Sequence, residues 1–170
     1  MSRENEPKRY LIRERVFRLG EDSDITDESG RPVLHVDGKV LSLRNRLVIR
    51  DTAGQEVAEV HRKLAALRST YQISVGGEQV AQVRKRMFTP FRDRFVIDIP
   101  GPDDYEVTGD LFDHEFTISQ GGRTVATVSK RWFTFRDTYA VEIAPGANDV
   151  LILASVLAVD LAEDQEHKDR

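Results

Sequence analysis

The chain has 170 residues, no cysteine and a formal net charge of −4, with 32% charged and 39% hydrophobic residues. This length suits one domain that buries about 70% of its unfolded surface without metals or disulfides. The absence of cysteine excludes thiol catalysis and thiolate metal sites, and the weak negative charge is typical of a soluble protein rather than a generally basic nucleic-acid binder.

The first residues predict a flexible N-terminus over 1–9. They carry charges of both signs and no apolar stretch, which argues against a signal peptide, so we expect a cytoplasmic location. A single domain is then expected over residues 10–162. It begins with a strand over 10–17, a turn over 20–24 and a short returning strand at Ile25 and Thr26.

A repeat begins at Gly30. The pattern Gly-x-x-Val-x-x-Val starts at Gly30, Gly54, Gly77 and Gly122, and a weaker copy starts at Gly101, which gives glycine spacings of 24, 23, 24 and 21 residues. The second half of each unit alternates apolar and polar residues, as in Tyr71-x-Ile73-x-Val75. Alternation with a period of two predicts β-strands with one buried face.

Each repeat unit therefore predicts two strands joined by a connection. Five units give ten strands, and the N-terminal pair brings the expected total to twelve. The Gly76-Gly77 and Gly121-Gly122 dipeptides predict hairpin turns, because glycine readily adopts the positive φ that these turns need.

Residues 148–161 predict a core helix. Val150 to Val159 contain Ser155 as their only polar residue, so no face of this helix suits water. Asn148 is a good N-cap, and the run falls short of the ~20 residues that span a bilayer. A twelve-stranded antiparallel sheet that closes around the helix would cover it and leave no free edge. The fold expected is mainly β, a closed barrel around a buried C-terminal helix, with a disordered charged tail over 163–170.

The order of several motifs resembles the LURP-one-related family, which is related to the Tubby C-terminal domain and to phospholipid scramblases. These motifs are residues 39–43 (KVLSL), 109–114 (GDLFDH), 130–135 (KRWFTF), 137–139 (DTY), 151–154 (LILA) and Asp160. The resemblance covers residues 10–161 and implies a Tubby-like barrel of twelve strands around a hydrophobic C-terminal helix.

The resemblance implies little about activity. Tubby domains bind phosphoinositides, but their lipid-contacting residues do not align with positions of this chain. Scramblases carry an acidic calcium-binding segment before their last helix, whereas residues 144–149 read APGAND, with too few carboxylates. Scramblase-like lipid handling is therefore the least favoured of the functions considered.

No catalytic or metal-binding pattern stands out. His35, His61, His114 and His167 lack the spacing of metal ligands, and no phosphate-binding loop or nucleophile elbow occurs. In a strand, Asp113 and Glu115 would lie on one face and His114 on the other, so these residues predict a surface or barrel-mouth cluster rather than a site. We expect a non-catalytic protein without cofactor or metal.

The basic residues are the most informative feature. Equivalent positions of three repeats carry Arg62-Lys63, Lys85-Arg86 and Lys130-Arg131, and the second of these repeats adds Arg84, Arg92 and Arg94. Neighbouring repeats should place these pairs in an arc at one rim of the barrel. The candidate binding residues are Arg62, Lys63, Arg84, Lys85, Arg86, Lys130 and Arg131.

Aromatic residues follow two of the basic pairs: Phe88, Phe91, Trp132, Phe133 and Phe135. Bases beside aromatic rings are what a domain that binds anionic phospholipid headgroups needs. A structural alternative is that the rings pack on the barrel and the bases are solvated or paired with acids such as Asp93 and Asp137. A second functional alternative is a protein-interaction module that does not bind lipid; no nucleic-acid reading module is present.

Overall fold

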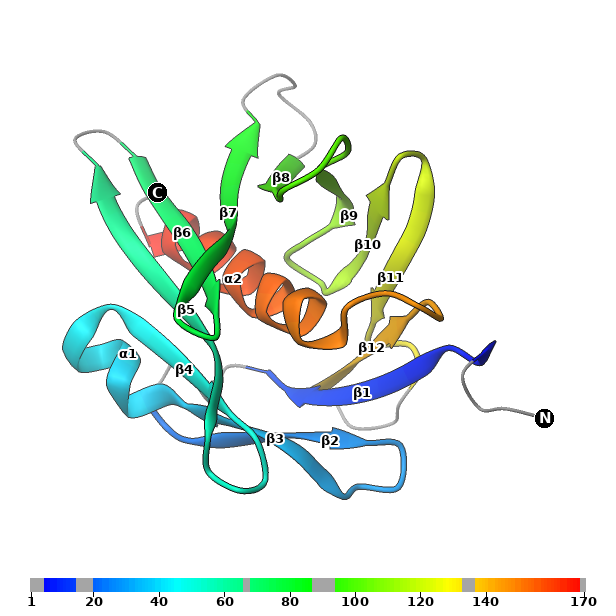
Figure 1. Ribbon diagram of the computed structural model, residues 1–170, viewed down its shortest axis with the longest axis horizontal. Helices are drawn as coiled ribbons and strands as arrows, with labels where there is room; N and C mark the ends of the chain where they lie inside the picture. The colour runs from blue at the N-terminus through cyan, green and yellow to red at the C-terminus, as the bar shows by residue number, and fades with distance from the viewer. Residues whose placement is uncertain (1–4, 15–19, 66–67, 87–93, 133–136, 169–170) are drawn as a thin grey trace.

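A closed antiparallel β-barrel surrounds one long helix in this computed structural model (Figure 1). The structure describes residues 5–14, 20–65, 68–86, 94–132 and 137–168. The strands are β1 Lys8–Arg13, β2 Ser23–Asp27, β3 Pro32–Asp37, β4 Arg46–Arg50, β5 Glu56–Ala65, β6 Arg68–Val75, β7 Glu78–Arg86, β8 Arg94–Asp98, β9 Tyr105–Asp110, β10 Glu115–Gln120, β11 Arg123–Ser129 and β12 Thr138–Ile143. The helices are α1 Gly38–Arg44 and α2 Asp149–Lys168.

Neighbouring strands follow one another in the chain, and β1 pairs with β12 to close the ring. The twelve-stranded barrel predicted from the repeats is confirmed. Because the strands alternate in direction, all odd-numbered strands end at the same rim. The C-terminal part of α2 reaches this rim, since Tyr71 near the start of β6 donates a hydrogen bond of 3.3 Å to the Leu161 carbonyl. We call this end of the barrel the exit rim and the opposite end the hairpin rim.

Each repeat unit forms two consecutive strands. The units that start at Gly30, Gly54, Gly77, Gly101 and Gly122 become β3–β4, β5–β6, β7–β8, β9–β10 and β11–β12. Gly76 and Gly77 have φ of 61° and 84°, and Gly121 and Gly122 have 56° and 78°, which confirms the two predicted hairpin turns. Both turns lie at the hairpin rim, where the connections are short.

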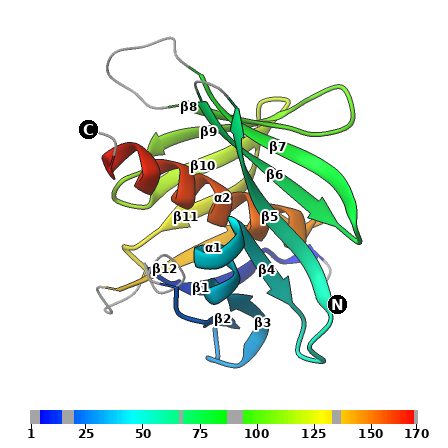
Figure 2. The same ribbon diagram turned by 90° about the vertical axis from the view of Figure 1, so that its left-hand side faces the viewer.

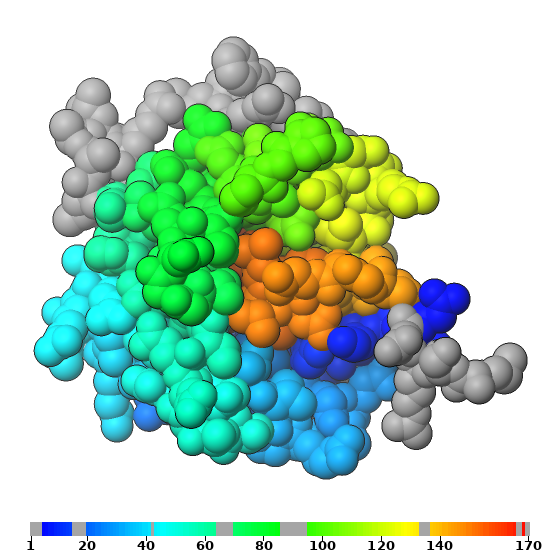
Figure 3. Space-filling view, in the orientation of Figure 1, coloured from blue at the N-terminus to red at the C-terminus, as the bar shows by residue number. Residues whose placement is uncertain are grey.

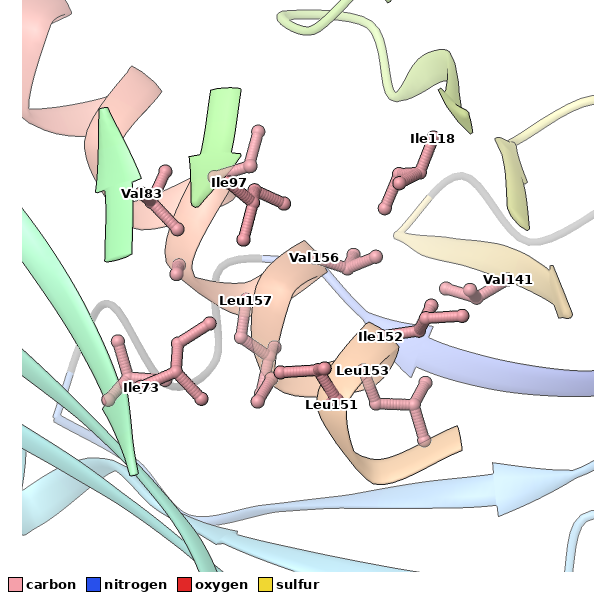
Figure 4. Packing of buried hydrophobic residues seen from close by; sticks show 14 of the residues in the cluster. Ile73, Val83, Ile97, Ile118, Val141, Leu151, Ile152, Leu153, Val156 and Leu157 are labelled. Carbon is pink, nitrogen blue, oxygen red and sulfur yellow. The ribbon is translucent and has the colours of Figure 1, made fainter. Parts of the chain in front are cut away.

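The barrel interior is filled by α2. Every residue from Leu151 to Ala162 is buried, and inward side chains of the strands, such as Ile73, Ile97 and Val141, surround the helix (Figure 4). Alternate residues of each strand point inward and pack against the apolar side chains of α2. Ser155 satisfies its hydroxyl locally by donating to the Leu151 carbonyl at 2.7 Å.

The N-terminal end of α2 is fastened at the hairpin rim. Asn148 acts as the predicted N-cap, since its side-chain oxygen accepts a hydrogen bond of 3.1 Å from the Leu151 amide. Asp149 accepts a 2.6 Å hydrogen bond from the Tyr10 hydroxyl and a 2.9 Å one from Lys8. Burial, together with the Asp149 carboxylate, raises the pKa of Tyr10. In Figure 3 the segment that leads into α2, coloured orange, is visible between the surrounding strands.

The first strand and the last helix extend beyond the ranges expected from the sequence. Strand β1 begins at Lys8, within residues 1–9, and α2 continues to Lys168, beyond the helix expected over 148–161. The physical reason is that Ala162 and Glu163 are still buried when the apolar run ends, so the helix has a wall to pack against for another turn. Lys168 and Asp164 then form an ion pair of 2.9 Å one turn apart.

Among the described residues, neither α1 nor α2 combines the length and the apolar content that a membrane-spanning helix requires.

The packing of α2 generates a matched pair of leucine substitutions. Leu153 is 1% exposed inside the barrel, whereas Leu43 on α1 is 82% exposed. Leu153→Ala should lower the free energy of unfolding by about 2–5 kcal/mol, because it leaves a cavity in a closed core. Leu43→Ala should change it by less than about 0.5 kcal/mol. Urea denaturation of the two variants measures both values, and equal effects would contradict the central role of the helix.

Candidate functional site

The three basic pairs lie at one rim of the barrel. The first pair lies within the last four residues of β5, the second pair ends β7, and the third directly follows β11. These are all odd-numbered strands and therefore all end at the exit rim. The barrel order places β6 between the first two pairs, and β8, β9 and β10 between the second and the third. The structure thus brings the predicted residues to a common rim, as an interrupted arc.

The first residue of each pair continues the inward-facing row of its strand. Arg62, Lys85 and Lys130 continue the inward rows of Val60, Val83 and Val128, and all three are half-buried. Their neighbours Lys63 and Arg131 point outward and are exposed, with the Arg131 side chain at 84%. Arg84 is also outward and exposed, whereas the Arg86 and Arg94 side chains and all of Arg92 lie outside the described residues.

Two of the candidate bases have strong acidic partners. Lys130 contacts Glu14 at 2.7 Å in a half-buried ion pair. Arg84 makes a two-pronged hydrogen bond to Asp98, with 2.8 Å between Arg84 Nη2 and Asp98 Oδ1, and this contact raises the pKa of the guanidinium. Arg131 lies 4.0 Å from Glu115, a loose contact at the surface. Lys63 and Arg131 are therefore the bases best placed to meet a ligand in solvent.

Helix α1 lies beside β4 and β5 (Figure 2) and adds basic residues to the exit rim. Asp37 caps its start by accepting from the Val40 amide at 3.3 Å, and Asn45 ends it with a left-handed φ of 55°. The Asn45 carbonyl then accepts a 2.9 Å hydrogen bond from the Arg62 amide, which places α1 beside the end of β5. Lys39 and Arg44 on α1 are exposed.

The sequence analysis did not assign α1 to the candidate surface. Residues 38–45 were a connection between two predicted strands, and only the fold places this connection next to β5. We call Lys39, Leu43, Arg44, Arg62, Lys63, Arg84 and Lys85 the basic sector.

The one described aromatic residue of the predicted set is held against the outside of the barrel. The Arg9 guanidinium lies 4.7 Å from the centre of the Trp132 ring and pairs with Glu142 at 2.7 Å. Since Glu142 lies opposite Arg9 on neighbouring strands, Trp132 covers the β1–β12 junction. Phe88, Phe91, Phe133 and Phe135 lie outside the described residues, as does Asp93.

His114 lies in a turn and not in a strand. Residues 111–114 form the turn between β9 and β10, and His114 has a left-handed φ of 53°. The alternation expected for residues 113–115 is therefore wrong, because the chain reverses where a strand would have continued. The imidazole is buried, its Nε2 lies 2.9 Å from Asp160 Oδ1, and it stacks on the Tyr139 ring at 4.4 Å.

Further charges connect this turn to the neighbouring strands. Glu14 Oε1 lies 3.6 Å from His114 Nδ1, and the other Glu14 oxygen holds Lys130. Glu115 accepts hydrogen bonds from the Ser129 hydroxyl at 2.8 Å and from the Lys130 amide at 2.9 Å. We call Glu14, His114, Glu115, Lys130 and Asp160 the rim network. It ties α2 to β1, the start of β10 and the end of β11.

Sequence reasoning missed the role of Asp160 and Glu14. A signal for Asp160 was available, because this residue stands between Val159 and Leu161 in the apolar helix. A carboxylate buried at such a position needs a partner. No comparable signal identified Glu14, which reaches the network through the pairing of β1 with β12.

The described residues offer no metal centre, since no three of their histidine, aspartate and glutamate side chains are arranged to hold an ion. His114 and Asp160 are only 3% and 4% exposed, so a substrate in solvent does not reach them. This arrangement is suited to stabilising the exit rim.

A groove of about 630 Å³ lies elsewhere, on the outside of β1, β2 and β3. Its charged lining is mainly acidic, with Asp22, Asp24 and Glu28 against Arg13 and His35, so it does not suit an anionic ligand.

Comparisons with known proteins give one consistent relationship. Residues 8–160 match the model of a family described as LURP-one-related. The chain is 31% identical over 159 residues to the uncharacterised protein YxjI of Bacillus subtilis (strain 168). The aligned region covers 92% of this chain and 95% of that protein. It also resembles the X-ray structure of an Arabidopsis thaliana protein, with a TM-score of 0.67, 17% identity, and 98% of this chain and 93% of that chain covered. The last similarity, at this low identity, concerns the fold.

The rim network generates a first prediction. Asp160→Ala removes the acceptor of the buried His114 imidazole and should lower the free energy of unfolding by about 1–3 kcal/mol. Asp113→Ala is a suitable control, because this neighbouring carboxylate is exposed and its loss should change stability by less than about 0.5 kcal/mol. Chemical denaturation at neutral pH compares them. An Asp160 variant as stable as the parent would show that the network does not hold the rim.

The turn that carries His114 generates a second prediction. Gly109 has a φ of +133°, and a Cβ there would lie 2.6 Å from the Glu115 carbonyl oxygen and 2.7 Å from the Phe116 Cα. Gly101 has a similar φ of +123° but no atom within 4 Å of the same position. Both alanine variants bear the strained backbone, so the difference between them isolates the collision. The free energy of unfolding of Gly109→Ala should be about 1–3 kcal/mol lower than that of Gly101→Ala. Thermal melts of both variants test this.

Proposed function

The chain belongs to the LURP-one-related family, and we propose that it is a non-catalytic binding module that binds anionic phospholipid headgroups at its exit rim. The observation that carries this proposal is the gathering of basic side chains from three strand ends at a single rim. Each base near an anionic surface contributes about 1 kcal/mol of attraction, so several together give weak and reversible binding.

The charges around the basic sector support an anionic ligand. Two of its nearby acids are already paired, because Asp98 holds Arg84 and Glu59 forms a close hydrogen bond with Arg46, while Asp22 lies 4.0 Å from Lys39. Asp37 is likewise occupied as the cap of α1. Lys63 and Arg44 are left exposed in this sector, and Arg131 is exposed on the other side of the same rim.

A binding role without catalysis fits the chemistry of the rim. The pair that most resembles a catalytic dyad, His114 and Asp160, is buried and stacked under Tyr139. The exposed candidate bases of the exit rim, Lys63, Arg84 and Arg131, are long cations, which attract an anion but do not activate a nucleophile. The protein therefore recognises charge at this rim and leaves its ligand chemically unchanged.

The proposal is tested with two double charge reversals that alter net charge equally. Lys63→Glu with Arg131→Glu removes the exposed outward bases of the exit rim. Arg50→Glu with Arg123→Glu, at the opposite hairpin rim, is the control; each pair takes the formal net charge from −4 to −8. Wild type should co-sediment with phosphatidylserine-containing vesicles at low salt, and the exit-rim variant should lose binding about tenfold or more beyond the control. Lys63, Arg131 and Arg123 are exposed and Arg50 is half-buried with one weak hydrogen bond, to the Gly54 carbonyl at 3.4 Å, so both variants should stay close to the parental melting temperature.

Salt and phosphate identify the kind of ligand. Binding should fall as salt rises from 0.01 M to 0.15 M, because the Debye length shrinks from about 30 Å to about 8 Å. Competition by inorganic phosphate at constant ionic strength would indicate a soluble phosphate ligand instead of a headgroup. If wild type does not sediment with any anionic vesicle at low salt, the lipid proposal fails and a protein partner becomes the better explanation of the rim.

A further inference from the structure

We infer that Leu43 of α1 enters the lipid interface when the exit rim docks on an anionic membrane surface. This inference rests on the proposed function. It adds which residue penetrates the lipid interface, and thereby how the barrel is oriented on the membrane. The rim would approach with its basic sector towards the lipid.

The placement of Leu43 is the first observation. Its side chain is 82% exposed, the highest value among the large exposed hydrophobic residues of the described chain. Helix α1 is otherwise seated on the barrel, since Leu41 packs against the core and Asp37 and Asn45 hold the two ends. The helix is thus fixed on the barrel, and its Leu43 side chain points away from the protein.

The charges around Leu43 are the second observation. Arg44 follows it directly, Lys39 lies one turn before it, and both are exposed. The hydrogen bond from the Arg62 amide to Asn45 brings Arg62 and Lys63 of β5 to the same edge. The acids beside α1 are at its N-terminal end, where Asp37 caps the helix and Asp22 lies 4.0 Å from Lys39, whereas Leu43 is in the last turn. An apolar side chain ringed by cations has the chemistry of an anchor in an anionic lipid interface.

Phe112 provides a contrast within the same rim. It is 55% exposed in the turn between β9 and β10, but Asp110 and Asp113, both exposed, flank it. Two carboxylates would be repelled by the anionic surface that attracts the basic sector. Both residues are exposed enough to enter a lipid interface, but only Leu43 has basic neighbours that an anionic surface would attract.

The test uses tryptophan fluorescence, because the chain contains a single tryptophan. In a Trp132→Phe background, one tryptophan is introduced by Leu43→Trp, Phe112→Trp or Thr52→Trp. Thr52 is exposed in the turn between β4 and β5, at the hairpin rim. Each protein is mixed at low salt with vesicles of phosphatidylcholine and phosphatidylserine. The expected result is a blue shift and quenching by brominated lipid for Leu43→Trp, and neither change for the other two.

A second variant measures how much the anchor contributes. Leu43→Ser in the otherwise unaltered chain should weaken vesicle binding about fivefold to thirtyfold, through loss of the apolar contact, while the response to salt persists. Because the Leu43 side chain is exposed, its replacement should not unfold the protein, and circular dichroism checks that the variant keeps its fold.

The outcomes separate the two proposals. If wild type binds vesicles but Leu43→Trp shows no blue shift, or Leu43→Ser binds as well as wild type, the anchor inference is wrong and headgroup binding stands. Blue shifts of equal size at all three positions would also overturn it, because they indicate contact without orientation. If wild type binds no anionic vesicle, both proposals fail together.

Discussion

The structure depends on the need to cover an apolar helix on every side. Residues Leu151 to Ala162 are buried all round, so a sheet with free edges would leave part of α2 in water. Closing the ring through the β1–β12 pair solves this problem and removes the sheet edges at the same time. The N-terminal strand is therefore as necessary to the fold as the C-terminal helix, and Lys8 and Tyr10 join the two directly through Asp149.

A helix longer than its apolar run brings charge to the end of the barrel. Asp160 and Glu163 are buried where α2 reaches the exit rim, and a buried carboxylate requires a partner. His114 meets Asp160, and Glu14 joins the same network through Lys130. This explains why a rim rich in bases is in part structural. Arg62, Lys85 and Lys130 continue the inward rows of their strands, whereas Lys63 and Arg131 are exposed.

The two rims consequently differ in chemistry. The hairpin rim holds short turns such as the two glycine dipeptides, whereas the exit rim carries α1, the His114 turn and the basic sector. Membership of the LURP-one-related family explains the architecture and, with an uncharacterised Bacillus subtilis relative, assigns no activity. The proposed role thus rests on the rim itself, where exposed cations and the exposed Leu43 lie at the same end of the barrel as the rim network.

The sequence by itself determined the strand pairs, the hairpin turns and the central helix, because these depend on periodicity and on local chemistry. Alternation with a period of two showed which side of each strand is buried, and the Gly76-Gly77 turn needed only residues that tolerate positive φ. The repeat also predicted correctly that the basic pairs share a rim. The tertiary structure alone decided how those bases are used. Whether Lys130 is a ligand contact or the partner of Glu14 depends on the meeting of the first strand with the last ones, and the hydrogen bond from the Arg62 amide to the Asn45 carbonyl decides that α1 lies beside β5. Such contacts follow from the tertiary arrangement of the barrel, which no local pattern of residues encodes.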